Sequence, residues 1–137
     1  MNKNQLNINK LPFEEKTVLS RLINHEGIEN AIKLQLLSDQ LNLEVRTLEN
    51  IIASLRIKGF PVGSSKSNVN GGIYIANSVE EIESTIIPKI AMVESLTKQI
   101  QALQKTMKEL PMILDYLNSQ RIHTDLGQLD LFTALAN

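Results

Sequence analysis

Few residues in this sequence have the types and spacing that chemistry at an active site requires. The chain of 137 residues has no cysteine, which rules out disulfides, thiolate metal ligands and a cysteine nucleophile. Its two histidines, His25 and His123, are distant from each other and belong to no carboxylate cluster at metal-ligand spacing, so we interpret both as surface residues. The sequence therefore predicts a protein without enzymatic activity, metal or cofactor, in a reducing compartment.

Hydrogen bonding to nucleic acid is the chemistry that basic and amide side chains in the middle of the chain could provide. The net charge of −1 argues against non-specific coating of nucleic acid, because that affinity comes mainly from neutralised phosphates. The charge is uneven, however. Residues 32–77 carry five basic and three acidic side chains, whereas residues 78–137 carry five basic and eight acidic ones. The middle of the chain is therefore mildly basic and the tail acidic.

The hydrophobic pattern indicates which elements would position these side chains. Three helices are predicted, the first beginning near Pro12, with ends at Gly27, Asn42 and Gly59. Their apolar stripes are Phe13, Val18, Leu19, Leu22 and Ile23 for the first, Ile32, Leu36, Leu37 and Leu41 for the second, and Leu48, Ile51, Ile52 and Leu55 for the third. Residues 60–64 and 73–75 then predict two short strands joined by a polar loop. Arg56, near the end of the third helix, is interpreted as a structural residue that pairs with a carbonyl or a carboxylate.

This order of elements, and the residues within it, resemble the winged helix-turn-helix domain of the biotin-repressor type over about residues 15–77. That family has a short helix ending in a Leu-Gly-Val type of turn, an Arg-Thr-Val sequence opening a recognition helix, and a Gly-Tyr pair closing the wing. The positions of this chain that match the pattern are Leu41-Asn42-Leu43, Arg46-Thr47-Leu48, Leu55-Arg56, Gly59, Phe60-Pro61-Val62 and Gly72-Ile73-Tyr74. The resemblance implies double-stranded DNA as a partner.

The resemblance also implies a role for each polar side chain of this segment. A recognition helix in the major groove would present Arg46, Thr47 and Asn50 to base edges. The residues that would face the DNA backbone or the minor groove are Lys33, Lys66, Asn68 and Asn70. Two departures from the family pattern, Glu44 and Glu49, lower the positive charge of this surface. They leave open a winged helix that contacts only proteins.

A long helix is predicted after the wing. Ser78 and Glu81 have the spacing of a capping box, in which a hydroxyl and a carboxylate each satisfy an unpaired backbone N–H. Pro88 is a candidate kink, and Pro111 a candidate start of a separate short helix. Apolar residues then follow the alternating spacing of a coiled-coil seam at Val93, Leu96, Ile100, Leu103, Met107, Leu110, Leu114 and Leu117. The pattern favours a homodimer, because a narrow seam buries best against its own copy; the alternative is a single helix folding back on the domain.

The sequence Gln128-Leu129-Asp130-Leu131-Phe132, near the end of the chain, resembles the pentapeptide with which bacterial proteins bind the sliding clamp of replication. All five positions match its Gln-Leu-Ser/Asp-Leu-Phe pattern. The resemblance implies that Gln128 hydrogen-bonds at the rim of a groove, that Leu131 and Phe132 fill an apolar pocket, and that Leu129 adds contact beside them. The alternative is that these apolar side chains, with Leu135, dock on the protein's own helices.

These patterns predict a mostly α fold with a small β-wing. We expect a flexible N-terminus over residues 1–10, a winged-helix domain over 11–77, a long helical segment, a coiled coil, over 78–118 and a flexible tail over 119–137. No segment approaches the roughly 20 apolar residues of a membrane span. The first ten residues have no apolar core of signal-peptide length, so we expect a cytoplasmic protein without membrane contact.

The predicted function is that of a dimeric DNA-binding accessory protein in replication or its regulation, of the kind that a phage or another mobile element encodes. The tail would recruit the sliding clamp or compete for it, since both purposes use the same pocket. One alternative is a dimeric winged-helix transcriptional regulator without clamp interaction, which predicts a palindromic operator. Another is a structural adaptor without affinity for DNA.

Overall fold

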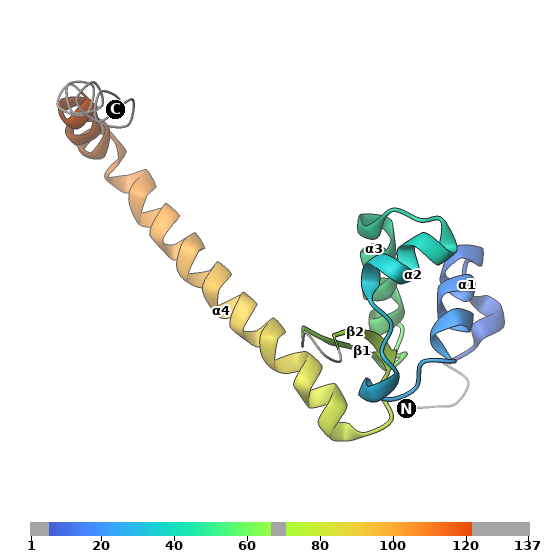
Figure 1. Cartoon of the computed structure of the whole chain (residues 1–137). Helices are drawn as coiled ribbons and strands as arrows, with labels where there is room; N and C mark the ends of the chain where they lie inside the picture. Colours follow the sequence, from blue (N-terminus) through green and yellow to red (C-terminus); the bar gives the residue numbers. More distant parts are fainter. Residues whose placement is uncertain (1–5, 67–70, 122–137) are drawn as a thin grey trace, which may run out of the picture. The chain divides into compact units, whose positions relative to one another are not determined.

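The computed structural model of the protein describes residues 6–66 and 71–121 (Figure 1). This part of the chain is mostly helical with one two-stranded sheet and a long helix, which confirms the predicted mostly α fold at that level. In order, the elements are the 3-10 helix η2 (Ile8–Lys10), α1 (Phe13–Leu22), the 3-10 helix η3 (Ile28–Asn30), α2 (Leu34–Leu41), α3 (Val45–Ile57), β1 (Val62–Ser65), β2 (Gly72–Ile75) and α4 (Val79–Lys108), followed by helix over residues 110–121. The chain divides into two compact units after Ile90, within α4, and each is described by itself.

The core of the first unit is built from α1, α2, α3 and the hairpin. The stripe predicted for α3 is buried, with Leu48 and Leu55 fully enclosed, because residues at this spacing share one face of a helix. The side chains that pack with it are Val18, Leu19, Leu22, Ile32, Leu37, Val62 and Ile73. Phe13 and Ile23, which the spacing also assigned to the buried stripe of α1, are exposed. They lie at its two ends, at the first residue and just after the last.

The turn between α2 and α3 is fixed by local hydrogen bonds. Asn42 ends α2 in the left-handed region, with a φ of 53°, which is a conformation that asparagine tolerates better than most residues. The buried Ser38 hydroxyl donates to the Leu43 carbonyl, and the Leu43 N–H donates back to the Ser38 carbonyl over 3.1 Å. These bonds determine the angle at which α3 leaves α2, as the turn predicted at Asn42 requires.

The two strands form the predicted antiparallel hairpin, with Val62 opposite Ile75 and Ser65 opposite Gly72. The chain between α1 and α2 pairs with the other edge of β2, which the sequence did not predict. Ile32 and Ile73 exchange two backbone hydrogen bonds of 2.8 and 2.9 Å. Ile32 was therefore wrongly assigned to the second helix, which begins at Leu34, because a coincidental helical spacing does not reveal pairing with a distant strand.

The residues before and after α1 also differ from the prediction. α1 ends at Leu22, not at Gly27, whose φ of 82° and N–H donation to the Ile75 carbonyl belong to the edge pairing. The N-terminal residues expected to be flexible include η2, because the Asn7 side chain accepts a hydrogen bond from the Asn9 N–H and caps this turn.

The second face of the hairpin buries Tyr74 completely. Its ring lies against the backbone of Gly63, where an added Cβ would approach ring atoms to 2.5 Å. Arg56 donates from Nε to the Val62 carbonyl over 2.7 Å, which confirms its predicted structural pairing, and its burial lowers its pKa. The Tyr74 hydroxyl and the Arg56 Nη2 are buried without a hydrogen-bond partner among the described residues.

The start of α4 is tied to the rest of the first unit. The Ser78 hydroxyl accepts from the Glu81 N–H, as the capping box predicts, whereas the Glu81 carboxylate accepts from the N–H of Asn77, one residue before the donor of a standard box. The second Glu81 oxygen accepts from the Ile28 N–H over 2.8 Å and so links α4 to η3. One turn later, Thr85 Oγ1 accepts from the Ser64 N–H of β1. Pro88 lies inside α4 without ending it.

The second unit contains the rest of α4 and the helix over residues 110–121. A turn at Glu109 separates the two helices, next to the break expected at Pro111. Residues 119–121 were wrongly assigned to a flexible tail, because helix continues to Arg121 and the Ser119 hydroxyl donates to the Tyr116 carbonyl; the rest of the predicted tail lies outside the described residues. Among the described residues, no helix is long and apolar enough to cross a membrane.

Candidate nucleic-acid interface

The outer face of α3 carries the residues predicted to meet DNA bases. Arg46 and Asn50 lie one turn apart, and both are exposed. Thr47 is half-buried, because it lies closer to the side of the helix that packs on the core. Glu49 and Ala53 complete this exposed face, which therefore presents a guanidinium, a carboxamide and a carboxylate on a rigid helix.

The N-terminus of α3 is exposed to solvent at Glu44 and Arg46. Glu44 is the N-cap residue, and its side chain makes no capping hydrogen bond to the helix. Its carboxylate still lies at the positive end of the helix dipole, where a negative charge is favourable. Glu44 stands where the biotin-repressor pattern has a small capping residue. It contributes a negative charge but no capping hydrogen bond, and this charge lowers the positive potential beside Arg46.

The end of the hairpin brings Lys33 and Lys66 to one region, although they are far apart in the sequence. Lys66 follows Ser65, whose cross-strand partner is Gly72. The backbone of Gly72 packs against the backbone of Ile32 and Lys33. A Cβ added to Gly72 would lie 3.0 Å from the backbone nitrogen of Lys33. Both lysine side chains are exposed. Asn68 and Asn70, the other residues predicted to contact DNA from the wing, lie outside the described residues.

Lys89 is a third lysine near this hairpin, and the sequence analysis missed it. Partial burial lowers its pKa, and the positive charges of Arg56 and Lys66 lower it further. These three cations are therefore close enough to interact, and together they make the surroundings of the hairpin more positive than the net charge suggests. Lys89 lies four residues before Val93, ahead of the predicted seam, and no spacing in the sequence distinguished it from other exposed lysines.

The remaining charges on this side of α3 are partly neutralised. Lys58 forms an ion pair with Glu15 at 2.7 Å, and the Ser54 hydroxyl donates to the same carboxylate oxygen over 2.9 Å. The bond from Lys58 holds the pKa of Glu15 below its ordinary value. Within the described ranges, neither Arg46 nor Lys33 forms an ion pair, so their charges remain accessible to a ligand.

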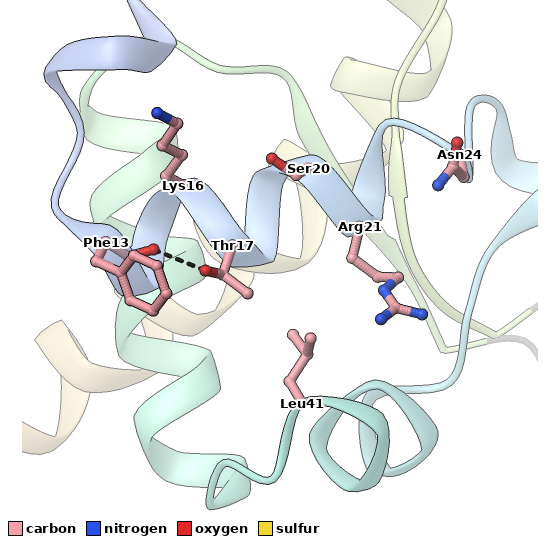
Figure 2. Close-up of a pocket in the computed structure, with 7 residues that line it drawn as sticks. All are labelled: Phe13, Lys16, Thr17, Ser20, Arg21, Asn24 and Leu41. Atoms are coloured by element: carbon pink, nitrogen blue, oxygen red, sulfur yellow. Dashed lines mark hydrogen bonds between the residues drawn. The ribbon is translucent and has the colours of Figure 1, made fainter.

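An open hollow beside α1 is a separate surface feature (Figure 2). It has a volume of about 460 Å³ and is lined by Phe13, Lys16, Thr17, Ser20, Arg21, Asn24 and Leu41. Figure 2 shows Phe13, Thr17 and Arg21 on the side of α1 that faces Leu41, with the Thr17 hydroxyl bonded to the Phe13 carbonyl. None of the lining residues is a carboxylate, a histidine or a cysteine, which are the side chains that most often bind metal ions.

The predicted dimer seam lies in the second unit and is exposed. Its residues Val93, Leu96, Ile100, Leu103 and Met107 are on α4, and Leu110 begins the next helix. The clamp-like residues Gln128, Leu129, Asp130, Leu131 and Phe132 lie outside the described residues.

Comparison of the chain with protein-family models, with curated proteins and with solved structures gave no match. Within the described residues, no group of three or more histidine, aspartate or glutamate side chains is arranged to hold a metal ion.

Proposed function

We propose that residues 11–77 form a winged helix that binds double-stranded DNA, and that the chain acts as a dimeric accessory protein in replication or its regulation. The observation that carries this proposal is the exposed pair Arg46 and Asn50 on α3, held by the turn at Asn42 and accompanied by Lys33 and Lys66 at the end of the hairpin. The protein would act by binding and not by catalysis.

The chemistry of these side chains fits the reading of base edges. An arginine can donate two hydrogen bonds to guanine, and an asparagine can bond both to the donor and to the acceptor of adenine in the major groove. A spacing of one helical turn allows Arg46 and Asn50 to contact neighbouring bases. The lysines at the hairpin would bind phosphates, which position the protein without reading sequence.

The exposed face of α3 carries little net positive charge, so one monomer would bind DNA weakly. We therefore infer that the protein binds a specific DNA site as a dimer. Glu49 lies beside Arg46 on this exposed face and would repel phosphates. Two weak half-site contacts on one DNA molecule would raise the affinity well above that of either. If the face instead contacts a protein, the 87% exposed Ile57 at the end of α3 would be part of that contact.

Replacement of Arg46 by alanine tests the DNA-binding proposal. A preferred duplex is first selected from randomised DNA with the wild-type protein at low salt. Loss of a base contact should then weaken binding to that duplex by about 1–3 kcal/mol, roughly five- to 150-fold, as measured by fluorescence anisotropy.

Arg21→Ala is the matched control for this test, because Arg21 is an exposed arginine on α1 to which we assign no DNA contact. It should retain wild-type affinity. Equal losses in the two variants would contradict base reading by α3, and failure to select any duplex at low salt would favour the protein-contact alternative.

The clamp part of the proposal rests on the pentapeptide over residues 128–132 alone. We expect the full chain to bind a purified bacterial sliding clamp with micromolar affinity, about −8 kcal/mol at 1 μM. Leu131→Ala combined with Phe132→Ala should abolish this binding, because these side chains would fill the apolar pocket. Leu135→Ala, outside the pentapeptide, should not.

Absence of wild-type binding at high clamp concentration would remove the clamp from the proposal. Equal losses of binding in the double variant and in Leu135→Ala would do the same. A dimeric winged-helix transcriptional regulator would then be the better interpretation, and its operator should be palindromic.

A further inference from the structure

The exposed face of α4 after Ile90 carries a pattern that specifies how a second copy would pair with it. In heptad notation Val93, Ile100 and Met107 occupy position a, and Leu96 and Leu103 occupy position d. We propose that two chains pair through this face as a parallel, in-register, two-stranded coiled coil. This inference rests on the homodimer of the proposed function and adds its orientation and register.

The exposure of these side chains calls for an occupant. The exposed fraction of these side chains ranges from 50% for Leu96 to 71% for Met107. Apolar side chains repeated along one helical seam bury most efficiently between the knobs and holes of an identical helix. A second copy therefore matches the length and spacing of the whole face.

The two seam positions differ in side-chain shape, and this difference specifies orientation. Val93 and Ile100 at position a are β-branched, whereas position d is leucine at 96, 103 and 110. In a parallel, in-register pair each residue faces its own copy, so β-branched layers alternate with leucine layers. That composition favours two strands over three or four. In an antiparallel pair, each a position would face a d position of the partner, so every layer would mix a β-branched residue or methionine with leucine. The division of β-branched residues and leucine between positions a and d would then not favour two strands.

The residues beside the seam permit this pairing. In a parallel dimer Gln99 of one chain lies beside Gln104 of its partner, so neutral amides meet where like charges would repel. Antiparallel pairing would bring Glu94 toward the partner's Lys108, but both are at exposed outer positions, where an ion pair contributes little. Side-chain shape in the seam is therefore the stronger influence on orientation.

Parallel pairing has a direct structural consequence. The Val79 ends of both α4 helices would lie at the same end of the coil, so the two N-terminal units of a dimer would be neighbours. A symmetric pair of DNA half-sites could then be bound by one dimer.

Single cysteine substitutions test orientation and register, because the chain has no cysteine of its own. Two cysteines can be bridged when their Cα atoms lie about 4.4–6.8 Å apart. Leu96→Cys in the full chain, under mild oxidation, should give at least about tenfold more disulfide-linked dimer than Ser95→Cys, its neighbour outside the seam. Met107→Cys should also cross-link to itself.

The remaining outcomes overturn the proposal in distinguishable ways. A mixture of Leu96→Cys and Met107→Cys chains that links mainly 96 to 107, without self-linked products of either, would show antiparallel pairing and leave the homodimer intact. A wild-type chain that sediments as a monomer would overturn the homodimer as well. DNA binding and clamp binding are measured in separate experiments. The cross-linking and sedimentation results therefore do not depend on whether the protein binds DNA or the clamp.

Discussion

Replacement of Gly72 by alanine should destabilise the first unit by about 3 kcal/mol or more. Gly72 has a φ of 144°, which side-chain-bearing residues rarely adopt, and an added Cβ would lie 2.3 Å from the Ile32 carbonyl oxygen. The obstacle is backbone, so it cannot move aside by rotation of a side chain. The loss should appear as a lower urea midpoint, measured at fixed protein concentration because dimerisation contributes to stability.

Lys66→Ala is the control for the Gly72 substitution, since Lys66 lies at the same end of the hairpin with an exposed side chain. It should unfold within about 0.5 kcal/mol of the wild type. If Gly72→Ala were equally mild, the close contact between β2 and the chain before α2 would be wrong, and with it the placement of Lys33 beside the hairpin.

Leu48→Ala should lower the free energy of unfolding by about 2–5 kcal/mol. Leu48 lies on α3 with no exposed surface and packs in the core formed with α1, α2 and the hairpin. Its truncation removes apolar contacts and leaves a cavity beneath the helix that carries Arg46 and Asn50. Urea or thermal unfolding followed by far-ultraviolet circular dichroism measures the change.

Ile57→Ala, on the same helix, is the matched control for Leu48→Ala because the Ile57 side chain is 87% exposed. We expect a change within about 0.5 kcal/mol. Comparable losses at both positions would contradict the assignment of inner and outer faces of α3, on which the proposed DNA contacts depend.

Local sequence pattern was sufficient wherever one element determines its own exposure. The spacing of Leu48 and Leu55 placed the inner face of α3, and that in turn placed Arg46 and Asn50 outside. The hairpin was also predictable, because β-favouring residues flank a polar loop. The turn at Asn42 followed from the conformations that asparagine tolerates.

Contacts between segments distant in sequence were not predictable in this way. The pairing of Ile32 with Ile73 uses backbone groups, which leave no mark in side-chain periodicity, so Ile32 was assigned to a helix. The same pairing brings Lys33 beside the hairpin, and the site therefore depends on a contact that spacing cannot reveal. Lys89 was missed for a related reason, since its neighbours Arg56 and Lys66 come from other elements.

Pro88 gives α4 a mechanical property that its length alone would not suggest. Because proline has no N–H, the Ser84 carbonyl loses its usual partner four residues later, and a helix turn without this bond bends more easily than a fully bonded one. It lies between Thr85, which is bonded to β1, and the seam that begins at Val93. In the DNA-bound dimer that we propose, elastic bending at this turn would accommodate half-sites of different separation without breaking the contact between Thr85 and the hairpin.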